Sequence, residues 1–140
     1  MTLHLHKREF TRGQLWIAVA GLSGAVAVVA DTLAAHIARN GPAAVEFNTG
    51  ARYGLLHALA LIAVTLLAMT NGAAGVAAAR FLAVAGWCFL GGLVLFPGSL
   101  YLLGAGAPAI LGSLAPLGGI LFIAGWLALM LFALAPRPAA

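Results

Sequence analysis

Five residues of the chain could carry chemistry, because their ionisable or phenolic side chains stand within or beside long apolar stretches. Asp31 and His36 belong to the first stretch, and Arg52, Tyr53 and His57 open the second. A charge at the centre of a membrane helix costs about 2.5–3.5 kcal/mol on insertion scales, so such groups need a reason to be there. One aspartate and two histidines could bind a transition metal or relay protons. They could also pair only to hold two helices together.

Helix geometry predicts which of these residues can meet. Along a helix that rises 1.5 Å per residue, Asp31 lies about 7 Å deeper than His36. His57 likewise lies about 7 Å deeper than Arg52. If the two stretches are antiparallel, Asp31 comes level with His57, and His36 comes level with the Arg52–Tyr53 pair. We therefore expect a two-layer polar patch in which Asp31 pairs with His57 or Arg52. The different depths of the two histidines disfavour haem ligation.

The rest of the sequence offers little for catalysis or for a metal cluster. Asp31 and Glu46 are the only acidic residues beyond residue 13, and Cys88 is the single cysteine. No nucleophile with its base, phosphate loop, paired carboxylates or metal-binding spacing such as CxxC is present in the sequence. We therefore expect no enzymatic activity, no catalytic residue, no metal and no cofactor.

The composition indicates that membrane-spanning helices position these residues. Of the 140 residues, 64% are hydrophobic and 7% are charged, against roughly 45–50% and a quarter in ordinary globular proteins. A soluble fold of this size would need much more polar surface. The net charge of +4 comes from seven scattered Lys and Arg residues, a pattern that does not form the basic stripe of a nucleic-acid-binding protein.

Four apolar segments come close to the roughly 20 residues that span the hydrocarbon of a bilayer. They cover residues 15–37, 53–70, 81–103 and 110–134. The breaks between them are short, which favours antiparallel neighbours. The sequence therefore predicts an all-α integral membrane protein, with an up-down-up-down bundle of four helices over residues 14–136. Within residues 39–51 we expect a short separate helix on the membrane surface, beginning at Pro42.

The basic residues predict the orientation of the bundle, because Lys and Arg accumulate in short cytoplasmic loops. Arg39 and Arg52 lie on one side. The other side has Lys7, Arg8, Arg12, Arg80 and Arg137. We therefore expect the tails 1–13 and 137–140 in the cytoplasm, in a multi-pass protein of the cell (inner) membrane. The polar patch then lies in the outer half of the bilayer.

Small residues and prolines predict how the helices pack. Alanines, glycines and a serine recur at helical spacing in the first span, which allows close approach of helix backbones: Ala20, Ser23, Gly24, Ala27, Ala30 and Ala34. Pro97 and Pro116 should each kink their span. The carbonyls that they free, of Leu93 and Gly112, could line a cavity or accept hydrogen bonds from Ser99 and Ser113.

Several motifs resemble a known family. They are Phe47-Asn48-Thr49-Gly50-Ala51-Arg52-Tyr53 followed by His57-Ala58-Leu59, Gly98-Ser99-Leu100-Tyr101-Leu102-Leu103, Ala115-Pro116-Leu117-Gly118-Gly119 with Gly125-Trp126, and Ala35-His36. In this order they are similar to the small membrane proteins of the domain of unknown function 423 family, which are YgdD-like or transmembrane-protein-256-like. The resemblance covers nearly the whole chain after the N-terminal tail, and it implies a four-helix membrane fold without known enzymatic activity.

The resemblance also ranks the candidate site residues. It carries over Arg52, Tyr53, His57, Ser99 and Tyr101, which match the family pattern. Two further residues depart from that pattern: Asp31 stands where a small residue is usual, and Pro97 stands where a small polar residue is usual. A role for Asp31 would therefore be particular to this chain.

Two functions remain open on this basis. The first is a non-enzymatic accessory or assembly component of a larger membrane complex, or a homo-oligomer. The alternative is a protein that binds or transports a lipid, a quinone or another small molecule in the outer half of the bilayer. Its tentative ligand-binding residues are Asp31, His36, Arg52, Tyr53, His57, Ser99 and Tyr101. A weaker third hypothesis is a metal site formed by Asp31, His36 and His57.

Overall fold

A computed structural model describes residues 11–36, 41–70 and 75–136 of the chain. The described residues form four α-helices: α1 (Arg12–His36), α2 (Pro42–Thr70), α3 (Gly75–Gly104) and α4 (Leu114–Leu134). A 3-10 helix, η1 (Ala109–Ser113), directly precedes α4. Four segments are each long and apolar enough to cross a membrane: α1, α2, α3, and the continuous stretch Ala109–Leu134, which consists of η1 and α4. The predicted all-α fold with four spans is confirmed.

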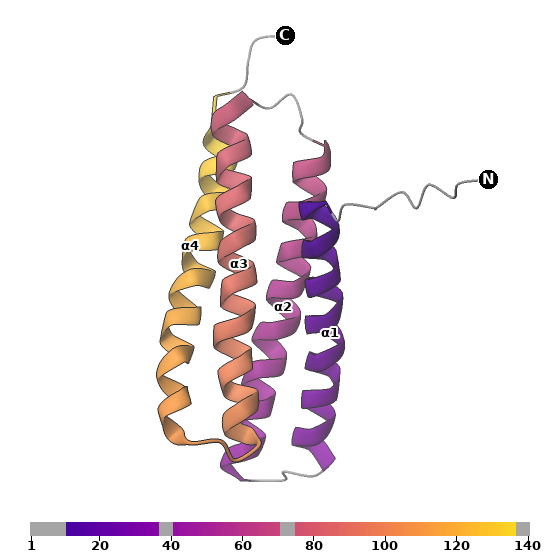
Figure 1. The fold of residues 1–140 in the computed structure, drawn as a ribbon, viewed down its shortest axis with the longest axis vertical. Helices are drawn as coiled ribbons and strands as arrows, with labels where there is room; N and C mark the ends of the chain where they lie inside the picture. The colour runs from indigo at the N-terminus through magenta and orange to yellow at the C-terminus, as the bar shows by residue number, and fades with distance from the viewer. Residues whose placement is uncertain (1–10, 37–40, 71–74, 137–140) are drawn as a thin grey trace, which may run out of the picture.

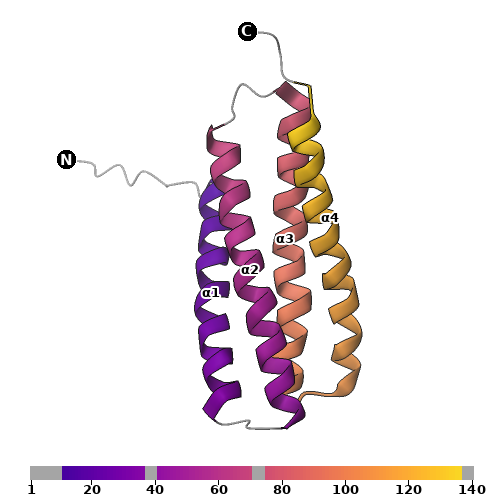
Figure 2. The same cartoon turned by 180° about the vertical axis from the view of Figure 1, so that it is seen from behind.

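The helices stand side by side in the order of the sequence, each antiparallel to the next (Figure 1). α2 and α3 occupy the middle, whereas α1 and α4 form the two edges, as the view from behind also shows (Figure 2). Each helix packs mainly on its sequence neighbour, and α1 touches α3 only slightly. Both edge helices therefore keep a wide exposed face.

Both the first residue of α1 and the last residue of α4 lie at one end of the bundle (Figure 1). We call this end, which also holds Thr70 and Gly75, the inner end. The opposite end, where α1 finishes and α2 begins, is the outer end. These names follow the orientation that the Lys and Arg residues predict, and that orientation stays a prediction. Residues 1–10 and 137–140, which form most of the predicted tails, lie outside the described residues.

α2 is longer than the sequence suggested. It runs unbroken from Pro42 for 29 residues, so the separate surface helix expected within residues 39–51 is wrong. The first turns of α2 are held by tertiary packing, because Ala44, Gly50 and Ala51 are buried there. At 1.5 Å per residue α2 measures about 43 Å, more than the roughly 30 Å of bilayer hydrocarbon. α2 therefore extends beyond the hydrocarbon.

Pro116 disturbs its helix less than expected, whereas the kink expected at Pro97 stays a prediction. α3 continues as one helix through Pro97. α4 begins at Leu114, so Pro116 lies in its first turn, where a missing N–H breaks no hydrogen bond. The kink expected at Pro116 is therefore wrong. The two serines also bond elsewhere than expected: Ser99 Oγ donates to the Phe96 carbonyl at 2.9 Å, and Ser113 Oγ donates to the Ile110 carbonyl at 2.7 Å.

Aromatic rings that lie against glycines form much of the helix packing. A Cβ atom added to Gly50 would come within 2.6 Å of the Tyr101 ring, and one added to Gly125 would come within 2.7 Å of the Phe89 ring. Further pairs are Trp16 on Gly86, Phe122 on Gly92 and Phe47 on Gly104, while Gly118 lies against the backbone of Phe96. The predicted small-residue face of α1 is confirmed for four alanines, which are buried: Ala20, Ala27, Ala30 and Ala34.

Candidate functional site

His57 lies inside the bundle, and both of its ring nitrogens have partners. The side chain is 3% exposed. Nδ1 lies 2.8 Å from the backbone carbonyl of Tyr53, which can only accept, so Nδ1 carries the hydrogen. Nε2 then accepts a hydrogen bond from the indole N–H of Trp126, across 3.3 Å. This pair of contacts assigns one neutral tautomer to His57 and ties α2 to α4.

Aromatic rings enclose the same imidazole. It stacks on Phe122 with ring centroids 3.5 Å apart and planes 11° apart. Tyr53, one turn earlier on α2, lies nearly parallel to it at 6.0 Å. We call the whole group the aromatic cluster; it comprises Tyr53, His57, Phe89, Phe96, Phe122 and Trp126. Because its rings come from α2, α3 and α4, the cluster fixes the packing of these three helices.

Asp31 of α1 and Arg52 of α2 lie together, beside a different face of α2 from the one that carries His57. Both side chains are exposed, and both line a groove of about 300 Å³ between α1 and α2, together with Thr32 and Asn48. We call it the outer groove. Within the described part of the chain, neither Asp31 nor Arg52 forms an ion pair. The outer groove therefore presents one charge of each sign to its surroundings.

The register of the first helix pair explains why Asp31 does not meet His57. The Cβ of Ala27 lies 3.7 Å from the Cβ that would be added to Gly54. Asp31, one turn towards the outer end from Ala27, therefore comes level with Arg52. The expected pairing of Asp31 with His57 is wrong, because α2 begins at Pro42 and not near Tyr53. Asp31 and Arg52 do share the outer groove, but the pair expected between them is not formed within the described residues.

The remaining predicted residues are dispersed. The ring of Tyr101 lies over Gly50 and Gly54, and its buried hydroxyl has no hydrogen-bond partner among the described residues. Ser99 is 3% exposed and bonds only within α3. His36 is the exposed last residue of α1. The structure therefore does not gather the seven predicted residues into one site.

The structure does not bring the three residues of the metal hypothesis, Asp31, His36 and His57, together. Within residues 11–36, 41–70 and 75–136, no three His, Cys, Asp or Glu side chains come together to hold an ion. The nitrogens of His57 are both occupied by Tyr53 and Trp126, while Asp31 lies in the outer groove.

Two functional features were missed from the sequence. Asn48 shares the outer groove with Arg52, and their spacing of four residues, which places both on one helix face, could have indicated this. Trp126, which the sequence presents only as part of a family motif, donates a hydrogen bond to His57. No pattern in the sequence indicates that bond, because the two residues are 69 positions apart.

Fold and site together define a multi-pass membrane protein with four helices, in which His57, Ser99 and Tyr101 are packed inside the bundle while Asp31 and Arg52 share an exposed groove. The chain belongs to the family described as "Protein of unknown function (DUF423)", whose profile matches residues 30–119. No solved structure matches the chain.

Related proteins carry names that agree with this class. The UPF0382 membrane protein YwdK of Bacillus subtilis is 39% identical over 87 residues, which is 62% of this chain and 67% of YwdK. The UPF0382 inner membrane protein YgdD of Escherichia coli is 32% identical over 121 residues, 80% of this chain and 82% of YgdD. A UPF0382 membrane protein of Staphylococcus epidermidis, SERP0230, is 38% identical over 79 residues; the match covers 56% of this chain and spans 59% of the relative. With the four spans, these names place the chain in the cell (inner) membrane, as predicted.

Proposed function

We propose that the chain is a non-enzymatic accessory protein that packs against a transmembrane helix of a partner protein through the exposed side of α1. The observation that carries this proposal is the exposed Asp31 of an edge helix, which lies beside an exposed Arg52 without an ion pair in the described part of the chain. A carboxylate facing lipid is costly, and a hydrogen-bond donor on a partner helix would lower that cost.

The exposed side of α1 has the shape that helix association in a membrane requires. Small or slender residues follow one another at helical spacing along it, and all are exposed: Gly21, Ala25, Val28, Thr32 and Ala35. A Cβ added to Gly21 would meet nothing within 4 Å, so this side is open. Since lipid gives no hydrophobic drive for association, close backbone approach along such a stripe is what favours a second helix.

Site-specific photo-cross-linking in the native membrane tests the proposal. A photoreactive residue at Val28 should form an adduct with another protein, and the same residue at Ala63, an exposed position of α2, should not. Ala25→Leu should abolish the adduct from Val28, whereas Ala63→Leu should leave it unchanged. Equal adducts from both positions, or an adduct that survives Ala25→Leu, would contradict the proposal. A product with twice the mass of the chain would instead indicate a homo-oligomer.

A second candidate function is the binding of a lipid headgroup in the outer groove. The observation in its favour is that Asp31 and Arg52, with opposite charges, line one space of about 300 Å³. The ammonium and the phosphate of phosphatidylethanolamine would match these two side chains. Native mass spectrometry with added phosphatidylethanolamine tests this, since Arg52→Gln should remove the retained lipid while Arg80→Gln should not. Quinone binding or transport has less support, because Tyr53 and His57 belong to the aromatic cluster.

A further inference from the structure

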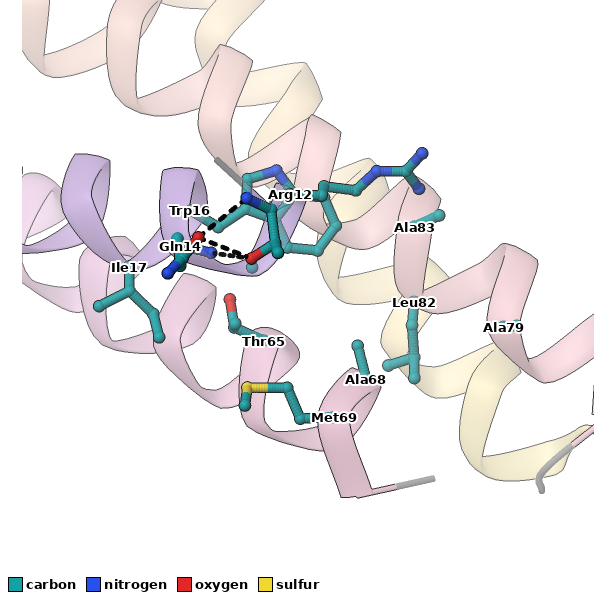
Figure 3. Close-up of a pocket in the computed structure, with 12 residues that line it drawn as sticks. Arg12, Gln14, Trp16, Ile17, Thr65, Ala68, Met69, Ala79, Leu82 and Ala83 are labelled. Carbon is teal, nitrogen blue, oxygen red and sulfur yellow. Dashed lines mark hydrogen bonds between the residues drawn. The ribbon is translucent and has the colours of Figure 1, made fainter. Parts of the chain in front are cut away.

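A cavity of about 470 Å³ lies at the inner end of the bundle, far from the outer groove. It is bounded by the first turns of α1, the last turns of α2 and the first turns of α3 (Figure 3). Its wall is mostly apolar, with Trp16, Ile17, Met69 and Leu82 as the large side chains. We call it the inner cavity.

The inner cavity exists because α1 is too short to fill the space between α2 and α3. A Cβ added to Gly13, in the first turn of α1, would lie 3.5 Å from the Thr65 side chain. α2 continues beyond that level to Thr70, and α3 also extends beyond the start of α1 (Figure 1). The alanines that face the space are too small to close it: Ala68, Ala79 and Ala83.

The start of α1 is fixed firmly at the edge of this cavity. Gln14 Oε1 accepts from the backbone N–H of Thr11 at 2.9 Å, and Thr11 Oγ1 accepts from the backbone N–H of Gln14 at 3.3 Å. This reciprocal capping box defines where the helix begins. The positive end of the helix dipole therefore lies at the wall of the cavity, which Thr11, Gly13 and Gln14 line.

Arg12 adds a full positive charge at the same place. Its side chain is exposed, lines the cavity and reaches from α1 towards Ala83 of α3 (Figure 3). Arg12 forms no ion pair with any residue in the described ranges. Trp16 forms part of the cavity wall but offers an occupant no hydrogen-bond donor, because its indole N–H is covered; that N–H has no partner among the described residues. An occupant must therefore combine an apolar part with an anionic group near Arg12.

We propose that the inner cavity binds an acyl chain of an anionic phospholipid whose phosphate contacts Arg12. Its volume falls within the roughly 300–1,000 Å³ of small-molecule pockets, and its wall suits a hydrocarbon chain. The guanidinium binds phosphate oxygens in a bidentate manner. The predicted orientation places this end in the cytoplasmic leaflet, where anionic lipids concentrate. This site is independent of the α1 face and of the outer groove.

Lipid titration of the full chain, read by native mass spectrometry in detergent micelles, tests the proposal. Dioleoyl phosphatidylglycerol should bind about tenfold more tightly than dioleoyl phosphatidylcholine, and Arg12→Gln should weaken phosphatidylglycerol binding by about fivefold. The matched control is Arg80→Gln, since Arg80 is also exposed near the inner end but does not line the cavity; this variant should bind like the natural chain. Inorganic phosphate alone should not compete.

A second pair of variants tests the apolar part of the site. Ala83→Phe should fill the cavity and lower the binding of both lipids, and Ala79→Phe serves the same purpose if Ala83→Phe lowers the thermal midpoint of unfolding. The proposal is overturned if both arginine variants lose the same affinity, because general surface charge then explains the preference. Equal affinity for the two lipids, unchanged binding to a folded cavity-filling variant, or full competition by inorganic phosphate would overturn it as well.

Discussion

Replacing His57 with phenylalanine keeps a flat ring against Phe122 but removes both hydrogen-bonding nitrogens. No cavity forms, because phenylalanine is not smaller than histidine. The lost interactions are those to the Tyr53 carbonyl and from the Trp126 indole. The carbonyl keeps its helical hydrogen bond, whereas the indole N–H loses the His57 nitrogen that accepts from it. We therefore expect His57→Phe to destabilise the bundle by about 1–2 kcal/mol, and His57→Ala to cost about 2–5 kcal/mol because it also opens a cavity.

A double-mutant cycle isolates the bond between His57 and Trp126. Its coupling energy with Trp126→Phe should be about 0.6–1.7 kcal/mol, the range of hydrogen bonds between membrane helices. Trp87 supplies the matched control: it is 50% exposed against 46% for Trp126, and its recorded ring contact is with Trp16. The cycle of His57→Phe with Trp87→Phe should be additive within about 0.3–0.5 kcal/mol.

Unfolding in mixed micelles, followed by circular dichroism as the denaturing detergent is titrated, gives the free energies for both cycles. The ¹⁵N chemical shifts of His57 give an independent check, because they should report a protonated Nδ1 and an unprotonated Nε2. Additivity in the cycle with Trp126, or a protonated Nε2, would refute the assigned hydrogen bond. His57 would then be free to serve a ligand.

Three further outcomes are expected. Gly118→Ala should lower the free energy of unfolding by about 1–3 kcal/mol or more, since the new Cβ would meet the Phe96 backbone. Gly98→Ala, with open space around it, should leave that free energy unchanged or raise it by up to about 1 kcal/mol. Thermal unfolding measures both. Tyr101→Phe should not destabilise, because the hydroxyl has no partner among the described residues; a loss of stability would reveal one. A fluorescent-protein fusion after Ala140 should fluoresce and a phosphatase fusion there should be inactive; the reverse would refute the cytoplasmic C-terminus.

Most of the fold could be predicted because it depends on local composition. Four apolar segments separated by short turns already determine four antiparallel helices. A helix start at Pro42 was predicted, but its continuity with the second span could not be found in this way, since Glu46, Asn48 and Thr49 make the first turns of α2 polar. That helix is held by contacts with other helices, such as the ring of Phe47 lying on Gly104. Contacts of this kind are invisible in a single stretch of sequence.

The candidate site was predicted only in part for the same reason. The depth at which Asp31 meets α2 depends on where the hairpin closes. Placing the start of the second span near Tyr53 instead of at Pro42 therefore shifts every expected pair along the two helices. Direction matters too. Asn48 and Arg52 face the outer groove, but Tyr53 and His57 face the aromatic cluster. Adjacent residues on a helix point about 100° apart, and the sequence does not tell which side faces which neighbour.

The family motifs now have a structural explanation that changes where function should be sought. Gly50 accommodates the Tyr101 ring, and His57 accepts from Trp126, so these motif residues secure one helix to the next. Residues that build a scaffold keep their types wherever the scaffold is kept, whatever each protein binds. Asp31 and Arg12 both lie outside the motifs by which the chain resembles its family, and Arg12 also lies outside the matched residues 30–119. Both are exposed charges at candidate binding surfaces. The activity of this chain is therefore better tested at Asp31 and Arg12 than at the motifs that identify its family.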